Sequence, residues 1–163
     1  MRVSIAALLL GLAACGPTGM SGPTINNKMS APTTETETVV STEILDREPR
    51  ANRTMVKHIL IGWADKGSAY QGGIDPRAAQ RSRRDAEREV RSLLKQLAAG
   101  ADFDALMKAH SEDKGSAADA EAYEVKPDAQ LVIEFRQLGL RLDPGEVGVV
   151  ESDYGFHVMK RIE

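Results

Sequence analysis

The sequence of 163 residues contains one cysteine, Cys15, and a single thiol cannot form a disulfide bond within the chain. It also lacks a basic excess: the formal net charge is −3, whereas nucleic-acid-binding domains usually carry a basic face. Its three histidines lie far apart, without the spacing of metal ligands. We therefore expect no internal disulfide, no nucleic-acid partner, no metal and no cofactor.

The N-terminus lacks an apolar run long enough to cross a membrane. Residues 5–14 are apolar, but a helix of this length reaches only about 15 Å, half of a bilayer core. Arg2 supplies a positive charge ahead of the run. A short apolar run behind a positive charge is typical of a signal peptide, which is removed and takes no part in the fold.

Residues 12–15, with the sequence Leu-Ala-Ala-Cys, resemble the lipobox of bacterial lipoproteins. The resemblance implies removal of residues 1–14 and attachment of lipid to Cys15; the alternative is an ordinary secretory signal beside an unrelated thiol. Two or more acyl chains anchor a protein stably. Gly16 is not the aspartate that often retains lipoproteins in an inner membrane. We expect a lipid-anchored protein of the cell envelope, on the periplasmic face and, in a Gram-negative cell, at the outer membrane.

Residues 15–53 combine this cysteine with a segment that is rich in Thr, Ser, Pro, Asn and Gly and has no aromatic residue. Such a segment cannot bury enough apolar surface to offset the entropy lost on ordering. We predict a flexible tether with a typical span of roughly 30–40 Å, followed by a folded domain over residues 54–163. A short helix at Ile44 and Leu45 is a further expectation.

The apolar pattern after residue 54 predicts an alternation of strands and helices. The expected strands cover residues 55–63, 123–125, 147–151 and 156–162, and the expected helices cover 79–98, a short stretch after Asp102, and 127–138. This order predicts an α+β domain with an antiparallel sheet and helices packed around it.

Four segments, taken in order, resemble the parvulin (PpiC or rotamase) family of peptidyl-prolyl cis-trans isomerases. They are VKHILI at 56–61, LAAGADFDAL at 97–106, SEDKGS at 111–116, and the closing hairpin with GEV at 145–147 and YGFHVMK at 154–160. The resemblance covers about residues 55–163. It implies a four-stranded antiparallel sheet surrounded by three to four helices.

The resemblance also implies the site. By position, His58 and His157 match the paired histidines of the family, Asp113 matches the acidic or thiol position between them, and Ser152 matches a hydroxyl residue that supports the histidines. The residues implied to bind substrate are Leu131, Phe135, Tyr123 and Met159.

The sequence departs from the family pattern beside the pocket. Tyr123 falls where the family usually has a leucine, and Glu124 falls where a glycine follows it. Ala120 and Glu121 replace a Gly-Gly pair. Because glycine adopts positive φ without steric cost, we expect this loop to take a different path.

These residue types suit rotation about a prolyl bond. The peptide bond resists rotation by about 18–20 kcal/mol because resonance keeps it planar. An apolar pocket favours the twisted amide, which has the smaller charge separation. Asp113 would face the substrate carbonyl. Each residue also has a purely structural alternative: the histidines could be a buried structural pair, Asp113 could cap a turn, and Leu131 and Phe135 could be ordinary core residues.

Arginines gather after the first predicted strand, at positions 77, 81, 83 and 84. Basic residues hold phosphate there in some relatives, and a solvated helix start is the alternative.

Three functions remain open at this point. The first is an isomerase that acts as a monomer on unfolded or proline-containing exported polypeptides and assists the folding of envelope proteins. The second, suggested by the lost glycines, is a catalytically weak parvulin-like chaperone or peptide-binding module. The third is a purely structural lipoprotein.

Overall fold

The computed structural model describes residues 38–163. The predicted signal peptide, Cys15 and the first part of the predicted tether lie outside the described residues. One antiparallel sheet has the strand order β2-β1-β4-β3. Its strands are β1 (Thr54–Ile61), β2 (Tyr123–Val125), β3 (Val147–Ser152) and β4 (Gly155–Arg161). The four-stranded antiparallel sheet expected from the sequence is confirmed.

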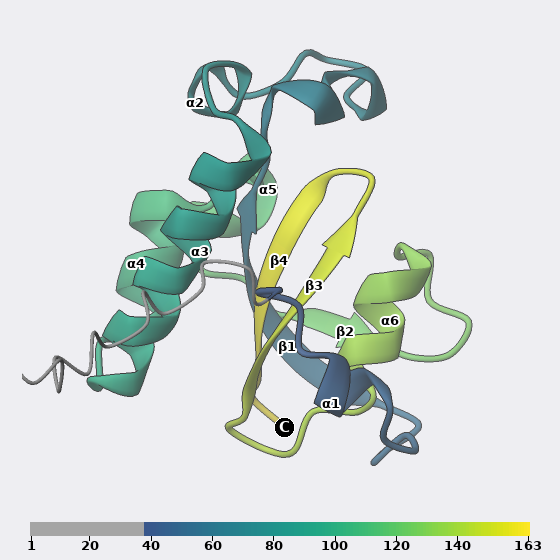
Figure 1. Cartoon of the computed structure of the whole chain (residues 1–163). Coiled ribbons are helices and arrows are strands. Elements are labelled where there is room, and N and C mark those ends of the chain that lie inside the picture. Colours follow the sequence, from purple (N-terminus) through teal and green to yellow (C-terminus); the bar gives the residue numbers. More distant parts are fainter. Residues whose placement is uncertain (1–37) are drawn as a thin grey trace, which may run out of the picture. The chain divides into compact units, whose positions relative to one another are not determined.

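Helices pack on both faces of this sheet (Figure 1). The helices of the described residues are α1 (Thr42–Leu45), the 3-10 helix η1 (Ala64–Ala69), α2 (Pro76–Ala79), α3 (Arg83–Ala98), α4 (Phe103–His110), α5 (Lys114–Ala117) and α6 (Ile133–Gly139). Within residues 38–163, none of these helices is both long enough and apolar enough to span a membrane.

Strand alternation decides which side chains reach the site. Successive side chains of a strand point to opposite faces, so His58 lies on one face of β1 and Ile59 on the other. In the β1–β4 pair, His58 is opposite Met159 and Leu60 is opposite His157. Paired residues share a face, so His58 and His157 are diagonal neighbours on the same face of the sheet.

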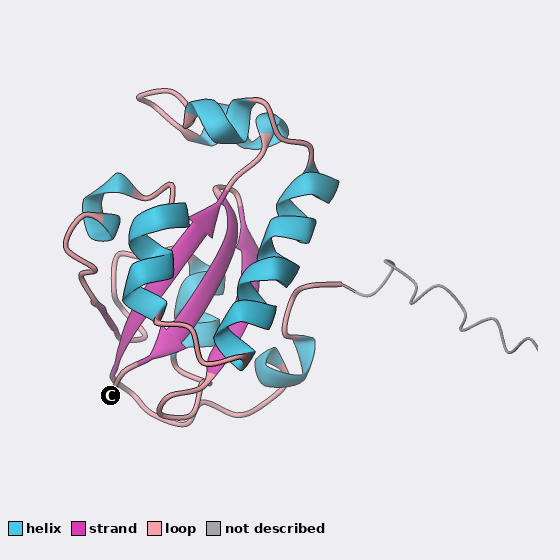
Figure 2. Ribbon diagram, turned by 90° about the vertical axis from the view of Figure 1, so that its left-hand side faces the viewer, coloured by secondary structure: helices cyan, strands magenta, loops and turns pink. Residues whose placement is uncertain are grey.

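The sheet separates two apolar clusters. On one face, α3 and α4 pack against residues such as Ile59 and Phe156, and in Figure 2 they lie in front of the strands. On the other face, α6 and Ile44 of α1 pack against residues that include Val56 and Met159. The histidines share this second face with α6, so the helix that carries Phe135 lies over them.

Local signals in the sequence set several element boundaries. Ser82 caps α3 in a reciprocal capping box with Asp85, and Asp102 caps α4 by accepting from the amide of Ala105. Gly155 has a φ of 138°, and a Cβ there would lie 2.5 Å from the carbonyl oxygen of Ile61. The tight turn from β3 to β4 therefore requires glycine at this position.

The helix predicted over residues 127–138 begins later than expected, at Ile133. The stretch before it forms tight turns, in which the amide of Ala129 donates to Lys126 and the amide of Leu131 donates to Ala129. These turns use the backbone groups that a first helical turn would need. As a result, Leu131 lies in a loop rather than on the helix.

The boundary expected at residue 54 also differs from the structure. Residues 38–53 are packed on the domain: Ile44 is 3% exposed, and the amide of Ser41 donates to the carbonyl of Val149 on β3. The Nη1 of Arg47 donates to both carboxylate oxygens of Glu146. Only a few apolar residues hold this segment on the domain. Its overall polar composition therefore gives no indication that it is packed. The short helix expected at Ile44 is present as α1.

Candidate active site

A cleft of about 640 Å³ opens on the face of the sheet covered by α6. It contains six of the residues expected to form the site, namely His58, Asp113, Tyr123, Leu131, Phe135 and His157. They come from β1, the segment before α5, β2, the loop before α6, α6 itself and β4. The fold therefore assembles a single site from residues 99 positions apart in the sequence.

A chain of hydrogen bonds joins the polar residues under the cleft. The Nε2 of His58 lies 2.9 Å from Asp113 Oδ2, and its Nδ1 lies 3.2 Å from the Nδ1 of His157. The Nε2 of His157 lies 2.7 Å from the hydroxyl of Ser152. That hydroxyl also accepts from the amide of Tyr154. Each ring nitrogen of His58 and His157 thus has a hydrogen-bond partner.

The order of donors in this chain follows from charge. Burial, and then the charge of His58, holds the pKa of His157 well below its usual value, so His157 is neutral. Asp113 is ionised and can only accept, so the Nε2 of His58 donates to it. The hydroxyl of Ser152 already accepts from the amide of Tyr154, so it donates to the Nε2 of His157. The proton of neutral His157 is therefore on its Nδ1, which donates to the Nδ1 of His58. We assign these tautomers because they leave no buried group unpaired.

Asp113 is ionised because hydrogen bonds favour its charged form. The bond from His58 lowers the pKa of the carboxyl group most, and bonds from Tyr123 and Ser116 add to it. Together they outweigh partial burial, which acts in the opposite direction. The side chain of Asp113 is 25% exposed, against 5% for His58. A fixed negative charge therefore faces the cleft.

Aromatic rings form the apolar wall of the cleft. The ring of Phe135 contacts His58 and His157 edge-on, with ring centroids 5.1 and 5.4 Å apart. Tyr123 contacts His58 in the same way at 5.3 Å. Leu131 lines the cleft from the loop before α6. This wall gives the cleft an apolar side above the polar groups.

Two expected site residues lie outside the cleft. Ser152 contacts it only through His157, consistent with a supporting position. Met159 is fully buried between the sheet and α6, in the same cluster as Leu138. It is opposite His58 on β4, but it is absent from the lining of the cleft, and its Cε lies against Gly139 of α6. The expectation that Met159 binds substrate is therefore replaced by a core role.

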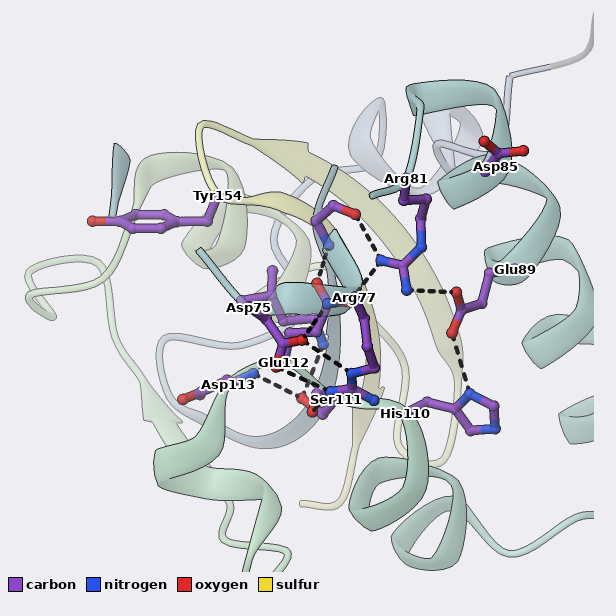
Figure 3. Close-up of polar contacts among 12 residues, drawn as sticks. Asp75, Arg77, Arg81, Asp85, Glu89, His110, Ser111, Glu112, Asp113 and Tyr154 are labelled. Atoms are coloured by element: carbon purple, nitrogen blue, oxygen red, sulfur yellow. Dashed lines mark hydrogen bonds and ion pairs between the residues drawn. The ribbon is translucent and has the colours of Figure 1, made fainter. Parts of the chain in front are cut away.

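Buried polar contacts fix the segment that carries Asp113 (Figure 3). The carboxylate of Glu112, whose side chain is 1% exposed, accepts from the amide of Gly62 and from Arg81, both at 2.6 Å. The hydroxyl of Ser111 accepts from the amide of Leu60. Burial raises the pKa of Glu112 although these partners oppose the shift. The segment is thus tied to the end of β1.

Two of the arginines after β1, Arg77 and Arg81, hold this segment in place. Arg81 contacts Glu89 at 2.9 Å as well as Glu112, and Arg77 donates to the carbonyl of Ser111 while pairing with Asp75. Neither of the alternatives drawn from the sequence describes Arg81, whose side chain is only 10% exposed. It is a buried structural cation, and carboxylates already neutralise it.

Sequence reasoning missed several residues of the site. Tyr70 and Ile74 line the cleft from the loop after β1, for which the sequence predicted no substrate-binding residue. Ser116 donates to Asp113 at 2.8 Å. Its place within the SEDKGS segment was the one available signal. The sequence carries no signal for the pairing of Glu112 with Arg81, because this contact depends on the tertiary fold.

The fold and this site define a small α+β domain with a partly apolar cleft above paired histidines. A family model described as "PPIC-type PPIASE domain" matches residues 42–163. The chain therefore belongs to the family of PPIC-type peptidyl-prolyl isomerase domains, as the sequence motifs predicted. Its fold is similar to that of peptidyl-prolyl isomerase ESS1 from Candida albicans, with a TM-score of 0.57 and 18% identity over 69% of this chain and 63% of that one.

Two curated relatives are much longer proteins. The chain is 29% identical over 140 residues to the chaperone SurA of Nitrosospira multiformis, a match that covers 85% of this chain and 29% of the relative. It is 33% identical over 75 residues to the foldase protein PrsA of Geobacillus kaustophilus, covering 45% of this chain and 27% of the relative. The chain thus spans less than a third of either relative.

Proposed function

We propose that this chain is a peptidyl-prolyl cis-trans isomerase that assists the folding of exported polypeptides while lipid on Cys15 holds it in the cell envelope. One observation carries the isomerase assignment: the hydrogen-bonded His58, His157 and ionised Asp113 lie directly under a cleft walled by Phe135. In this proposal the cleft binds a proline and the polar groups act on the preceding carbonyl.

The proposed chemistry is differential binding. Rotation needs no bond cleavage, only a site that binds the twisted amide better than either planar form. Each tenfold gain in rate requires about 1.36 kcal/mol of such preference. The apolar wall favours the less charge-separated twisted amide. The Asp113 carboxylate adds to this preference, because a negative charge beside the carbonyl opposes the charge on oxygen that amide resonance creates.

The names of the relatives support a role in folding. One relative is a chaperone and another is a foldase. Both carry a region similar to this domain within a longer chain. We infer that the present chain offers its clients the isomerase cleft, and that its clients are unfolded polypeptides exposing proline.

Two assays on the whole chain test the function. The first follows cis-trans exchange in a short proline peptide, coupled to a protease that cleaves only the trans form. The second follows the aggregation of an unfolded protein. The proposal predicts acceleration in the first assay at catalytic amounts of the chain. Suppression of aggregation at equal amounts, with no acceleration of exchange, would instead show a peptide-binding module.

The anchor is supported by the Leu-Ala-Ala-Cys sequence at 12–15 and by the position of Cys15 directly after a short apolar run. Expression of the full chain with a Cys15→Ser control tests it. Mass spectrometry of the mature N-terminus should find an acylated Cys15 in the parent chain and none in the variant. A parent chain without acyl groups would remove the anchor from the proposal and leave the isomerase assignment intact.

A further inference from the structure

The carboxylate of Asp113 has an unusually complete set of donors. Its Oδ2 accepts from the Nε2 of His58 at 2.9 Å, from the hydroxyl of Ser116 at 2.8 Å and from the hydroxyl of Tyr123 at 2.7 Å. Its Oδ1 accepts from the amide of Gly115 at 3.1 Å. A carboxylate offers about four acceptor sites. Asp113 is therefore fixed in orientation, and its four donors leave it little capacity to accept a hydrogen bond from a substrate.

Of the four donors to Asp113, Tyr123 is the one that departs from the family pattern. The family usually has leucine at this position, and a leucine side chain cannot donate a hydrogen bond. The ring of Tyr123 still performs the apolar task of the leucine, because it contacts His58 and Phe135 edge-on at 5.3 and 5.9 Å. The hydroxyl is thus an addition to the apolar wall rather than a replacement for it.

The surroundings of Asp113 make this donor important. The titratable groups that face the carboxylate are His58 from β1, His157 from β4, Tyr123 from β2, Lys114 from α5, Tyr70 from the loop after β1 and the adjacent Glu112. Partial burial works against the charged form of Asp113. Nearby donors that bond to the charged form directly offset that burial.

We propose that Tyr123 is a positioning residue of the isomerase site, whose hydroxyl fixes the Asp113 carboxylate toward His58 while its ring forms part of the proline-binding wall. This inference deepens the proposed function and rests on it for its kinetic part. The hydroxyl acts on the rate of the twisting step, because it fixes the charge beside the carbonyl. The ring acts on substrate affinity.

Titration of the Asp113 carboxyl carbon by NMR tests the contact without substrate. In the whole chain carrying Tyr123→Phe, the midpoint should move to higher pH than in the parent, because the charged form loses a donor. Tyr70→Phe is the matched control. It removes a hydroxyl from the same cleft that donates to the carbonyl of Tyr154 and not to Asp113. Its Asp113 midpoint should stay at the parent value.

Kinetics of the same variants test the consequence. Tyr123→Phe should lower kcat about tenfold, the effect of losing one hydrogen bond to a charged group, with KM within twofold of the parent. Tyr123→Leu should lower kcat similarly and also raise KM, because it shortens the wall. An unchanged kcat and an unchanged Asp113 midpoint in Tyr123→Phe would overturn the inference.

The two proposals fail separately. A parent chain without isomerase activity would refute the proposed function, whereas the Asp113 titration would still decide whether Tyr123 holds the carboxylate. A parent chain that is active, with a Tyr123→Phe variant that lowers affinity alone, would leave the isomerase in place and refute the positioning role.

Discussion

His157 is a titratable residue that the fold buries almost completely. It is 5% exposed, and its two ring nitrogens contact His58 and Ser152. The family motif predicted this histidine and its partner from the sequence. The motif did not predict its state, because a depressed pKa depends on how completely the strands and α6 exclude water.

The depressed pKa of His157 predicts a pH dependence of stability. Between the folded value and the usual value of 6.5, the unfolded chain binds a proton that the folded chain does not. The free energy of unfolding should therefore decrease as the pH falls below about 6.5, by up to about 1.4 kcal/mol per pH unit from this group. Urea unfolding of the parent and of His157→Gln at pH values of about 7.5, 6.5, 5.5 and 4.5 would measure this pH dependence.

The comparison with the variant isolates this proton. Glu112, with its raised pKa, contributes in the opposite direction, since a raised carboxyl pKa favours the folded state as the pH falls. This contribution is common to both proteins and cancels in the difference. Parallel pH dependences for the parent and His157→Gln would show that His157 is not held neutral.

Among the structural elements, the segment before α5 is held by tertiary hydrogen bonds to β1, Gly62 and Arg81. The SEDKGS pattern predicted the role of this segment. The Arg81–Glu112 pair that holds the segment was not predictable, because a 31-residue separation carries no local signal. Similarly, the late start of α6 follows from turns that compete with the helix, which propensity alone did not reveal.

Loss of one member of this buried pair should be costly. Arg81→Met leaves the Glu112 charge buried with fewer partners, and we expect a loss of about 3–5 kcal/mol in the free energy of unfolding. Because Glu112 adjoins Asp113, isomerase activity should fall even in conditions where the variant is folded. Chemical denaturation and the peptide assay measure the two effects.

An exposed pair provides the control for this prediction. Arg53 and Glu124 contact each other at 2.5 Å, but their side chains are 67% and 38% exposed. Arg53→Met should cost less than about 1 kcal/mol. Equal losses at the two arginines would mean that burial does not govern the Arg81–Glu112 contact.

The α1 segment should contribute to stability although the sequence placed it in a tether. Ile44 is 3% exposed and packs close to Gly148, where an added Cβ would lie 3.1 Å from its Cδ1. Ile44→Ala should lower the free energy of unfolding by about 2–4 kcal/mol. The same change at Ile162, which is 43% exposed, should cost less than about 1 kcal/mol. A similar cost at both positions would indicate that the segment is not docked in solution.

At the scale of the whole molecule, the strands and helices that apolar periodicity predicted are present in the structure. Strand alternation and the hairpin glycine placed His58 and His157 on one face, and the family motifs placed Asp113 and Phe135 beside them. Met159 illustrates the limit: it lies on the same face as the histidines, but full burial against α6 makes it a core residue. The domain boundary was misplaced because packing of residues 38–53 rests on a few apolar contacts.

The central claim is that the cleft under α6 is where prolyl bonds are twisted. A matched pair of substitutions, Phe135→Leu in the cleft and Phe103→Leu in the opposite apolar cluster, tests it, because both phenylalanines are almost fully buried. The measurement is the cis-trans exchange rate of a proline peptide by NMR with each whole chain, folded as judged by its spectrum. The account predicts that Phe135→Leu loses at least about tenfold in catalysed exchange, equivalent to about 1.36 kcal/mol, while Phe103→Leu stays within about twofold of the parent, a change well below that energy. Equal exchange rates for the two variants would contradict it.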